Sequence, residues 1–433
     1  MNISILSVFP QLYQPFLQTS LVKRAQDQKL VQFTLADFFS FVSPKERIDA
    51  PTFGHGAGML IKPEVVQKAI ESQEAAQGKA YKIFFSPHGK KLDQKLLQKI
   101  TQHAQNTNHL MLVAGRYEGM DARVEEYYAD EVVSIGDFVL MGGDLPAMIL
   151  LEGLLRLIPG VVGKSESVSS DSFIGPFVDY PEYTMPVTWQ DKMVPEVIRS
   201  GDHAAIKQWR MNQAINRTLE SHFEWLRSYP LSEPQKQLVA DAIPPHYVVL
   251  MHNEVIVADG DRVGTTSVTS LDIHDIARSA RTYGIKNYFI VTQLLDQQKI
   301  VRKLLDFWQI GEGIEYNASR HEAVKRVELL NSLDEAILQI EKKEGIKPLV
   351  IGTSARIFSH AQEITFHDQG TVWKHKKPIL MIFGTGKGLA PQVLERCDYL
   401  LVPVQGLNGY NHLSVRSAVA IVLDRWLGLN VKK

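Results

Sequence analysis

The stretch SIGDFVLMGGDLP, residues 134–146, is the longest of three glycine-rich turns in the first 150 residues; the others are GHGAG at 54–58 and GRYEG at 115–119. Glycine permits backbone conformations and close approaches that a Cβ atom forbids. Three such turns at strand ends predict a site whose backbone amide and carbonyl groups hold a flat heterocycle. For any one turn taken alone, a tight turn without a ligand is an equally good interpretation.

Strand-like runs accompany these turns. Residues 3–9 are rich in β-branched and aromatic residues, and apolar runs at 82–85 and 110–114 are each followed by Gly or Pro. Stretches with helical periodicity lie between them, at 63–74 and 93–105. Strands that alternate with helices predict parallel βαβ packing, in which ligands bind at the loops that follow the strands.

The same alternation restarts after the pair Pro244-Pro245. We expect further strands near 247–250, 288–291, 348–351, 379–383 and 399–402, and helices near 275–282, 297–308 and 415–426. A Ser-rich stretch at 163–172 is typical of a mobile loop or linker, and a helical region is expected at about 193–242. The sequence therefore predicts two α/β domains joined around residue 243.

Composition excludes several classes of protein. The 433 residues are 45% hydrophobic and 22% charged, which excludes wholesale disorder, and one cysteine, Cys397, excludes an intramolecular disulfide framework. No run approaches the roughly 18–20 apolar residues of a membrane span, and the first residues lack a charged signal region, so we expect a cytoplasmic protein without membrane association. The net charge of −1 means that a nucleic-acid partner would be met by local basic patches.

The familiar nucleotide and metal signatures do not fit. GTGKG at 384–388 lacks the spacer and the Ser or Thr of a P-loop, and it lacks the spacing of a dinucleotide fingerprint. His55, His88, His203 and His412 show no metal-ligand spacing, so no metal site is predicted.

A series of ordered blocks makes the first half similar to a known family. Residues 1 to about 240 resemble the bacterial tRNA (guanine-37-N1)-methyltransferases, the TrmD family. The matching blocks are SPxGxxLDQ at 86–94, GRYEGxDxR at 115–123, SIGDFVL at 134–140, GGxLPA at 142–147, RxIPGV at 156–161, DSF at 171–173, PxYTxP at 181–186 and GDHxxIxxWR at 201–210.

The resemblance implies an α/β fold with two SPOUT-type domains with C-terminal trefoil knots, the first followed by a small helical RNA-binding subdomain. Such a knot is a rare exception to the rule that chains do not thread loops. The implied parts are a methyltransferase domain at 1–162, a flexible interdomain loop at 163–178, a helical tRNA-binding subdomain at 179–243 and a second SPOUT-like RNA methyltransferase domain at 246–433. The implied partners are the anticodon loop of tRNA and a second copy in a homodimer.

The resemblance also implies the methyl donor S-adenosylmethionine as cofactor, bound in the knot of the first domain; a Mg²⁺ requirement stays open. The positions that the family assigns to this cofactor are Ser86, Pro87, Gly115, Tyr117, Glu118, Gly119, Ser134, Ile135, Gly136, Asp137, Phe138, Val139, Leu140, Gly142, Gly143 and Pro146.

The chemistry of guanine N1 suggests which further groups are needed. N1 carries a proton at neutral pH and has no free lone pair, so its methylation requires a general base such as a carboxylate. Negative charge then builds on O6, where a guanidinium is well suited to stabilise it. The family assigns the base to the position of Asp171 and the arginine to that of Arg156. On sequence alone, a helix cap or an Asx-turn is the better interpretation of Asp171 in the Ser-rich stretch, and Arg156 could equally be a surface ion-pair partner.

A second candidate surface lies in the helical region. Lys207, Trp209, Arg210 and Arg217 predict an RNA cradle, with a solvated charged face over core tryptophans as the alternative. The chain departs from the family pattern at Ala50, His55 and Asp144, so we expect altered contacts around the catalytic loop or the RNA.

Residues 246–428 resemble another SPOUT-class group, an RNA methyltransferase domain that is found fused to TrmD. The blocks are DIHDIARSARTYG at 272–284, GTSAR at 352–356, FGTGxGL at 383–389 and YNHLSVRSA at 410–418. The resemblance implies a second S-adenosylmethionine near Thr353, Gly384, Gly388, Pro403, Leu413 and Ser414. Arg278 and Arg356 are candidates for a phosphate contact. The domain either methylates a different RNA site or is a non-catalytic module for RNA capture or dimerisation.

Overall fold

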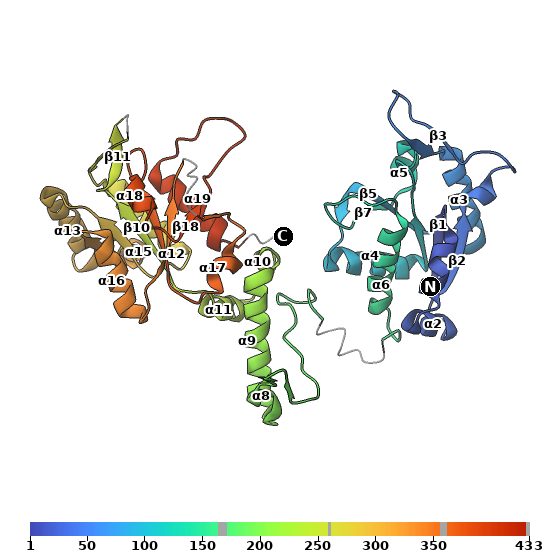
Figure 1. Ribbon diagram of the computed structural model, residues 1–433, viewed down its shortest axis with the longest axis horizontal. Coiled ribbons are helices and arrows are strands. Elements are labelled where there is room, and N and C mark those ends of the chain that lie inside the picture. Colours follow the sequence, from blue (N-terminus) through green and yellow to red (C-terminus); the bar gives the residue numbers. More distant parts are fainter. Residues whose placement is uncertain (163–170, 259–260, 356–361, 430–433) are drawn as a thin grey trace. The chain divides into compact units, whose positions relative to one another are not determined.

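The computed structural model describes residues 1–162, 171–258, 261–355 and 362–429. The chain folds into two compact units, an N-terminal unit at Met1–Gly175 and a C-terminal unit at Pro176–Lys433 (Figure 1). The division falls inside the predicted interdomain loop, 163–178, of which residues 163–170 lie outside the described part of the chain.

A five-stranded parallel sheet forms the centre of the N-terminal unit, in the order β2-β1-β6-β5-β7. Its strands are β1 (Asn2–Ser7), β2 (Gln32–Asp37), β5 (Tyr81–Lys91), β6 (His109–Val113) and β7 (Glu131–Ser134). The strands predicted from the apolar runs at 3–9, 82–85 and 110–114 are confirmed as β1, β5 and β6. A separate antiparallel hairpin, β3 (Asp49–Pro51) and β4 (Met59–Ile61), surrounds the first glycine-rich turn.

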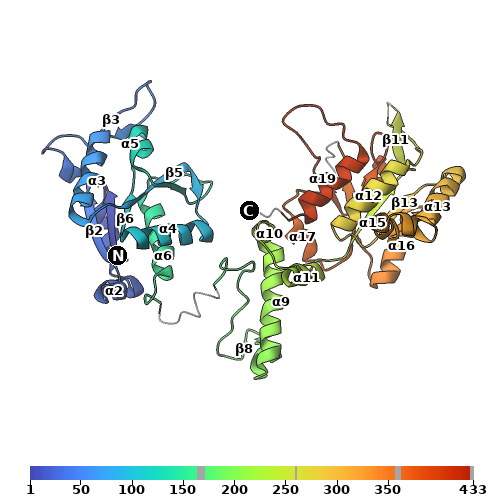
Figure 2. The same ribbon diagram turned by 180° about the vertical axis from the view of Figure 1, so that it is seen from behind.

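Helices cover both faces of this sheet (Figures 1 and 2). One core cluster joins the sheet to α1 (Tyr13–Leu17), α2 (Ser20–Asp27), α4 (Gln94–Thr107) and α6 (Asp144–Leu157). The other joins it to α3 (Pro63–Gln77) and α5 (Ala122–Tyr128). The helices predicted at 63–74 and 93–105 are therefore confirmed.

Helix α4 shows how the local sequence produces these elements. The Asp93 side chain accepts a hydrogen bond from the backbone N–H of Leu96 and so caps the first turn. Leu96, Ile100 and Ala104, spaced by four residues, are buried against the sheet on one face of the helix. The helix ends at Asn108 in the left-handed conformation, with φ of 53°.

The C-terminal unit is built on a seven-stranded parallel sheet in the order β14-β13-β10-β17-β15-β18-β16. The strands are β10 (His246–Met251), β13 (Tyr288–Val291), β14 (Val327–Leu330), β15 (Leu349–Thr353), β16 (Glu363–Ile364), β17 (Ile379–Gly384) and β18 (Tyr399–Leu401). Two small antiparallel pairs, β8 (Thr188–Trp189) with β9 (Lys192–Met193) and β11 (Val255–Ala258) with β12 (Arg262–Gly264), lie outside it.

Its helices follow the sheet strands in sequence, as the alternation predicted. They are α12 (Ser270–Thr282), α13 (Leu295–Gln309), α14 (Gly313–Tyr316), α15 (Ala318–Val324), α16 (Leu333–Glu344), α17 (Gln369–Trp373), α18 (Pro391–Leu394) and α19 (Val415–Leu427). All five strands and three helices that the sequence predicted after residue 244 are present.

Four further helices precede this sheet, as predicted for 193–242: α8 (Glu196–Arg199), α9 (His203–Ser221), α10 (Phe223–Arg227) and α11 (Glu233–Ala242). We call α8–α11 the helical module. Its residues Ile215, Leu219 and Phe223 belong to the same hydrophobic core as Ile273 and Met381 of the sheet domain. The helical module is therefore packed into the C-terminal unit.

Arg227 ties the helical module to the last helix. Its buried guanidinium donates to the backbone carbonyls of Asp424, Arg425 and Gly428, at 2.9–3.0 Å, where α19 ends. The last carbonyls of a helix lack partners within the helix and carry partial negative charge, so a cation there is stabilising. A Cβ on Gly370 of α17 would lie 1.8 Å from the carbonyl oxygen of Glu220, so α9 and α17 approach too closely for any other residue.

Two buried histidines make the stability of the C-terminal unit sensitive to acid. Burial lowers the pKa of His246 to about 4, and the Trp373 and Trp426 indole N–H groups both point to its Nε2. Because indole is only a donor, His246 must stay neutral to accept these bonds. Burial also lowers the pKa of His252 to about 4.

The unfolded chain binds a proton at each histidine below about pH 6.5, whereas the folded unit binds it only near pH 4, so acid favours unfolding. We expect the free energy of unfolding of the C-terminal unit to fall by about 2 kcal/mol per histidine between pH 7 and pH 5. All six tryptophans lie after residue 175, so tryptophan fluorescence during urea unfolding reports this unit alone. His367→Gln, which replaces a surface histidine, is the control and should show the same pH dependence as the wild type. A urea midpoint of the wild type that is the same at pH 7 and pH 5 would contradict the prediction.

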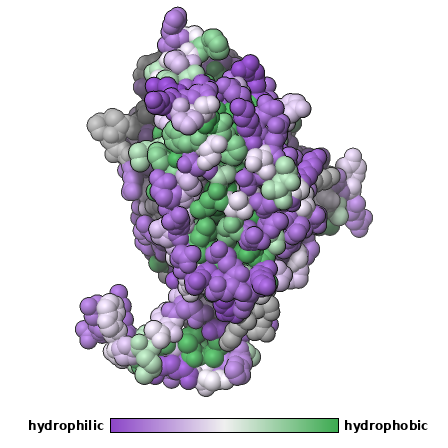
Figure 3. Space-filling model, turned by 90° about the vertical axis from the view of Figure 1, so that its right-hand side faces the viewer, coloured by the Kyte–Doolittle hydropathy of each residue, from purple (hydrophilic) through white to green (hydrophobic). Residues whose placement is uncertain are grey.

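One face of the N-terminal unit is turned to the viewer in Figure 3. Hydrophobic side chains form a central band on it between hydrophilic margins, as is normal for a surface that polar residues cannot cover completely. Among the described residues, none of the helices combines the length and the apolar character needed to cross a membrane.

Candidate cofactor pockets and catalytic pair

A pocket of about 490 Å³ lies at the carboxyl ends of β5, β6 and β7 in the N-terminal unit. Its walls come from residues 85–87 within β5, where the register with β7 is irregular, from the turn at 115–119 and from the turn at 134–143 with Pro146. Because parallel strands all end at the same edge of the sheet, loops far apart in sequence meet there. This is the edge that the sequence predicted as the binding edge.

Fifteen of the sixteen predicted cofactor positions line this pocket. They are Ser86, Pro87, Gly115, Tyr117, Glu118, Gly119, Ser134, Ile135, Gly136, Phe138, Val139, Leu140, Gly142, Gly143 and Pro146. Asp137 does not line it, since its side chain is 90% exposed and pairs with Lys91. Four further residues, Phe85, Arg116, Val133 and Met141, line it without having been predicted, although all four neighbour predicted positions.

The glycine-rich turns at 115–119 and 134–146 are hydrogen-bonded to each other. The backbone N–H of Gly143 donates to the carbonyl of Gly115 at 2.8 Å. A Cβ on Gly143 would lie 3.0 Å from the Cα of Ala114 and the N of Gly115, tighter than ordinary van der Waals contact. Glycine at 143 therefore allows the two turns to meet and to close one side of the pocket.

The first glycine-rich turn, at 54–58, plays a different part from that predicted. It joins β3 to β4 and does not line the pocket. The hairpin instead supports the wall, because the backbone N–H of Glu118 donates to the carbonyl of Met59 at 3.0 Å. Of the positions that depart from the family pattern, Ala50 pairs with Leu60 in this hairpin and His55 has a positive φ of 59°.

Asp144, the third departure, forms a buried polar cluster beneath the pocket. Its carboxylate is 1% exposed and accepts from the Ser7 hydroxyl at 2.5 Å, the Tyr13 hydroxyl at 3.0 Å and Nε of Arg116 at 2.7 Å. Burial, and then the charge of Asp144, raises the pKa of Tyr13, which stays a donor. The cluster connects β1, the turn after β6 and the first turn of α6.

Replacing Asp144 by Ala should destabilise the N-terminal unit by about 3–5 kcal/mol, because the change leaves the Arg116 guanidinium without its buried partner. Hydrogen–deuterium exchange of the backbone amides of β1 and β6, followed by mass spectrometry, measures this unit separately. Asp137→Ala, in the same turn but exposed, is the matched control and should leave the exchange rates of those amides unchanged. Equal exchange in both variants would contradict a structural role for the buried cluster.

The two predicted catalytic residues are in direct contact. Nε of Arg156 lies 2.5 Å from Oδ2 of Asp171, and Nη2 lies 2.8 Å from Oδ1. The contact is therefore a bidentate ion pair, with both side chains partly exposed, between the last turn of α6 and the residues that follow 163–170. Neither residue lines the pocket of about 490 Å³.

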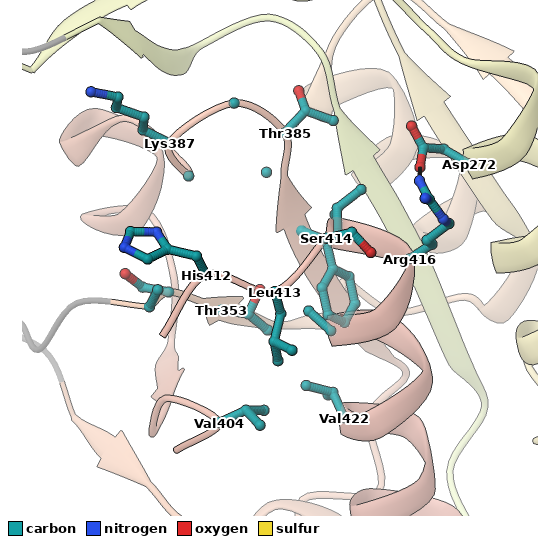
Figure 4. Close-up of a pocket in the computed structure, with 18 of the residues that line it drawn as sticks. Asp272, Thr353, Thr385, Lys387, Val404, His412, Leu413, Ser414, Arg416 and Val422 are labelled. Atoms are coloured by element: carbon teal, nitrogen blue, oxygen red, sulfur yellow. Dashed lines mark hydrogen bonds and ion pairs between the residues drawn. The ribbon is translucent and has the colours of Figure 1, made fainter. Parts of the chain in front are cut away.

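A second pocket, of about 450 Å³, lies at the carboxyl edge of the sheet of the C-terminal unit (Figure 4). Five of the six predicted positions, Thr353, Gly384, Gly388, Leu413 and Ser414, line it. Pro403 does not, although its neighbours Val402 and Val404 do. Arg356 lies outside the described residues, and Arg278 is exposed on α12 away from the lining.

The sequence did not single out the polar wall of this second pocket. Thr266, Ser267, Thr269 and Asp272 line one side, and Arg416 reaches from the first turn of α19 to Asp272 with Nη1 at 3.3 Å from Oδ1, as Figure 4 shows. The Thr269 hydroxyl donates to the same carboxylate at 2.6 Å. Of these residues, Asp272 and Arg416 occur in the sequence blocks, but their pairing depends on how α12 and α19 pack.

The predicted RNA cradle lies along α9. Trp209 and Trp225 are both partly exposed, so neither is fully buried in a core, and the RNA cradle stays a prediction. The Trp209 ring lies 6.2 Å from that of Tyr183, and the Arg210 guanidinium lies over the ring of Tyr180 at 4.7 Å. Aromatic and cationic side chains thus lie together where residues 180–183 meet α9.

Two family models match the chain, one in each half. Residues 1–228 match the family model described as tRNA (guanine-1)-methyltransferase TrmD, and residues 245–428 match one described as SAM-dependent RNA methyltransferase.

Three relatives illustrate the pattern. The tRNA (guanine-N(1)-)-methyltransferases of Nitratidesulfovibrio vulgaris and Oleidesulfovibrio alaskensis are 36% and 37% identical, each over 99% of both chains. That of Bacillus licheniformis is 37% identical over 98% of its own length but only 56% of this chain. Since the similarity extends over whole proteins, the chain belongs to the TrmD family of tRNA (guanine-1)-methyltransferases.

Proposed function

We propose that the protein transfers a methyl group from S-adenosylmethionine to N1 of the guanine at position 37 of tRNA. The observation that carries this proposal is the pocket at the carboxyl edge of the N-terminal sheet, formed by the positions that the family uses for its cofactor. Full-length relatives that are named tRNA (guanine-N(1)-)-methyltransferase support the reaction class.

The residues of the first pocket fit the proposed cofactor. Its volume of about 490 Å³ is within the usual range of roughly 300–1,000 Å³ for small-molecule sites. The glycine-rich turns at 115–119 and 134–143 present backbone donors and acceptors to an adenine ring and a ribose, and the Glu118 carboxylate favours a cationic ligand. S-adenosylmethionine, when bound, supplies an electrophilic methyl group on a sulfonium.

Asp171 is the proposed general base. Its carboxylate accepts the N1 proton of guanine, which frees the lone pair that the methyl group needs. Arg156 holds Asp171 through two hydrogen bonds, which fixes the orientation of the carboxylate. Negative charge builds on O6 of the guanine as the N1 proton leaves. The guanidinium of Arg156, which lies beside the Asp171 carboxylate, is proposed to donate a hydrogen bond to O6.

This function is tested by the position of the product. A tRNA transcript with guanine at position 37 is incubated with the protein and S-adenosylmethionine, digested with nuclease and analysed by mass spectrometry. We expect 1-methylguanosine in the fragment that contains position 37, and none in a matched transcript with adenine there. Methylation at another position, or no 1-methylguanosine, would contradict the proposal.

We further propose that each sheet domain ends in a trefoil knot of the SPOUT class. The proposed bounds are 1–162 for the first sheet domain, 179–243 for the helical tRNA-binding subdomain and 246–433 for the second sheet domain. Two copies are proposed to associate through an apolar surface on the N-terminal unit. Supporting this, Leu145 and Ile149 of α6 are 57% and 50% exposed, and Val139 and Met141 in the preceding turn are 94% and 86% exposed. A cytoplasmic location and recognition of the anticodon loop complete the proposal.

For the C-terminal domain, the second pocket favours a cofactor-binding methyltransferase that acts on a different RNA site. The pocket combines a glycine-rich turn at 384–388 with the polar wall of Thr269, Asp272 and Arg416. A non-catalytic domain used for RNA capture or dimerisation has no need for such a pocket. The number of cofactor molecules bound per chain distinguishes the two.

A further inference from the structure

An unpaired basic loop lies where the C-terminal sheet domain meets the helical module. The loop, residues 374–377, reads Lys-His-Lys-Lys and connects α17 to β17. Lys374 and Lys376 are exposed and Lys377 is partly exposed. In the described part of the chain, no carboxylate lies within 4.0 Å of these three ammonium groups.

Some other cations of this unit have a carboxylate partner. Lys299 pairs with Asp296 and Arg281 with Glu322, so these charges are neutralised locally. Leaving three neighbouring ammonium groups without partners is unfavourable through their mutual repulsion, unless a polyanion binds them. The basic loop is therefore suited to an anionic partner.

The position of the basic loop identifies that partner. Lys376 lines a hollow of about 280 Å³ together with Asn216 and Glu220 of α9 and with residues 241–245, which include the end of α11. The lining itself holds one lysine, Lys376, and two carboxylates, Glu220 and Asp241, and the loop adds Lys374 and Lys377 beside it. The basic loop thus adjoins the helical module at this hollow, and the positive charge there comes from the loop.

Cations also lie along α9, where Arg210 pairs with Glu182 at 3.7 Å and Arg217 donates to the carbonyl of Asp179 at 3.3 Å. Lys207, Arg210 and Arg217 are separated by three and seven residues, spacings that return to nearly the same side of a helix. α9 packs against α17, whose end leads directly into the basic loop. A helix of 19 residues is about 28 Å long, a length suited to following the backbone of an RNA arm.

The rigid attachment of the helical module fixes the distance between the cations of α9 and the lysines of the basic loop. Phe223 of the module packs edge-to-face on Trp373 at 4.9 Å, one residue before the basic loop, and Gly370 allows α17 to touch the backbone of α9. Arg227 fixes the module to the end of α19. An RNA bound to α9 is therefore presented to the basic loop at a fixed distance.

We propose that the tRNA-binding surface of this protein extends from α9 onto the basic loop of the C-terminal domain, where Lys374, Lys376 and Lys377 contact the RNA phosphate backbone. This inference rests on the proposed function only for the identity of the RNA as tRNA. The basic loop precedes β17, whereas the second pocket follows it, so the loop lies at the opposite edge of the sheet. Its role is to hold RNA rather than to take part in chemistry at that pocket.

The test is the salt dependence of tRNA binding by the full-length protein. A plot of log Kobs against log salt concentration has a negative slope, and each phosphate contact increases its magnitude by about 0.7–0.9. The test variant carries Lys374→Gln, Lys376→Gln and Lys377→Gln and is titrated against a fluorescein-labelled tRNA transcript. The magnitude of its salt slope should be smaller by about 2, and its affinity at 0.15 M KCl should be about tenfold weaker. Fluorescence anisotropy measures both quantities.

The matched control removes three lysines elsewhere in the same unit, Lys299→Gln, Lys303→Gln and Lys342→Gln on α13 and α16, which lie away from α9 (Figure 1). It should retain the wild-type slope and affinity. An unchanged slope in the basic-loop variant, or an equal decrease in the control, would overturn the proposal. Circular dichroism should show that both variants are folded, as expected for exposed side chains.

A kinetic readout separates this inference from the proposed function. In the methylation assay, the basic-loop variant should show a KM for tRNA raised about tenfold with unchanged kcat, because only RNA binding is affected. If the wild type binds tRNA but forms no 1-methylguanosine, the proposed function fails while the anisotropy data still decide on the surface. A lowered kcat with unchanged KM and binding would overturn the surface instead.

Discussion

Asp171→Asn should lower kcat for methylation of guanine 37 by at least about a hundredfold. Asparagine keeps the size and much of the hydrogen-bonding shape of aspartate but cannot take up the N1 proton, and general bases contribute on the order of 10²–10⁴ in rate. Single-turnover formation of 1-methylguanosine, measured by mass spectrometry at saturating tRNA, isolates this step. Affinity for tRNA, measured separately, should change little.

Asp27→Asn is the matched control for this variant. Asp27 is an exposed acid of α2 whose carboxylate lies 4.0 Å from the Lys23 ammonium group. Its single-turnover rate should equal that of the wild type. The role of Arg156 is examined with Arg156→Lys, which retains the charge but not the planar bidentate contact with Asp171. We expect an intermediate rate, and an undiminished rate in Asp171→Asn would exclude Asp171 as the base.

Calorimetric titration with S-adenosylmethionine should give two sites per chain for the wild type and one for Gly384→Ala. A Cβ at residue 384 would lie 2.7 Å from the backbone N of Leu389 and 2.8 Å from the carbonyl carbon of Gly388. Since these are backbone atoms, the turn at 384–388 must shift, and this turn lines the second pocket. The remaining site is the pocket of the N-terminal unit.

Gly406→Ala is the matched control, because a Cβ at residue 406 meets nothing within 4 Å. It should retain two sites. A single site in the wild type would reject cofactor binding by the C-terminal domain and would favour a domain used for RNA capture or dimerisation. Two sites in Gly384→Ala would show that the turn at 384–388 does not hold the cofactor.

Local patterns in the sequence predicted many of the strands and helices near the pockets, although β7 and α6 at the first pocket were not predicted. Runs such as 110–114 and 379–383 are apolar throughout because a strand of a doubly covered parallel sheet is buried on both faces, and they form β6 and β17. The positions around the first pocket could be predicted from the resemblance of the ordered blocks to a known family, although Asp137 in the same turn does not line it.

Contacts between distant segments could not be predicted in this way. Asp144 was noted only as a departure from the family pattern, whereas its partners Ser7 and Tyr13 lie more than 130 residues away. The same holds for Asp272 and Arg416, which are 144 residues apart. Periodicity and spacing carry no information about which buried polar groups satisfy one another.

The sequence by itself determined the family, the two parallel-sheet domains, and the turns that form both pockets, because these depend on residue order and local periodicity. Only the tertiary structure decided that Arg227 joins the helical module to α19, that Asp171 lies against Arg156, and that the basic loop adjoins α9 at a hollow. These features arise when distant segments pack together, and packing depends on shape, burial and hydrogen-bond satisfaction in three dimensions.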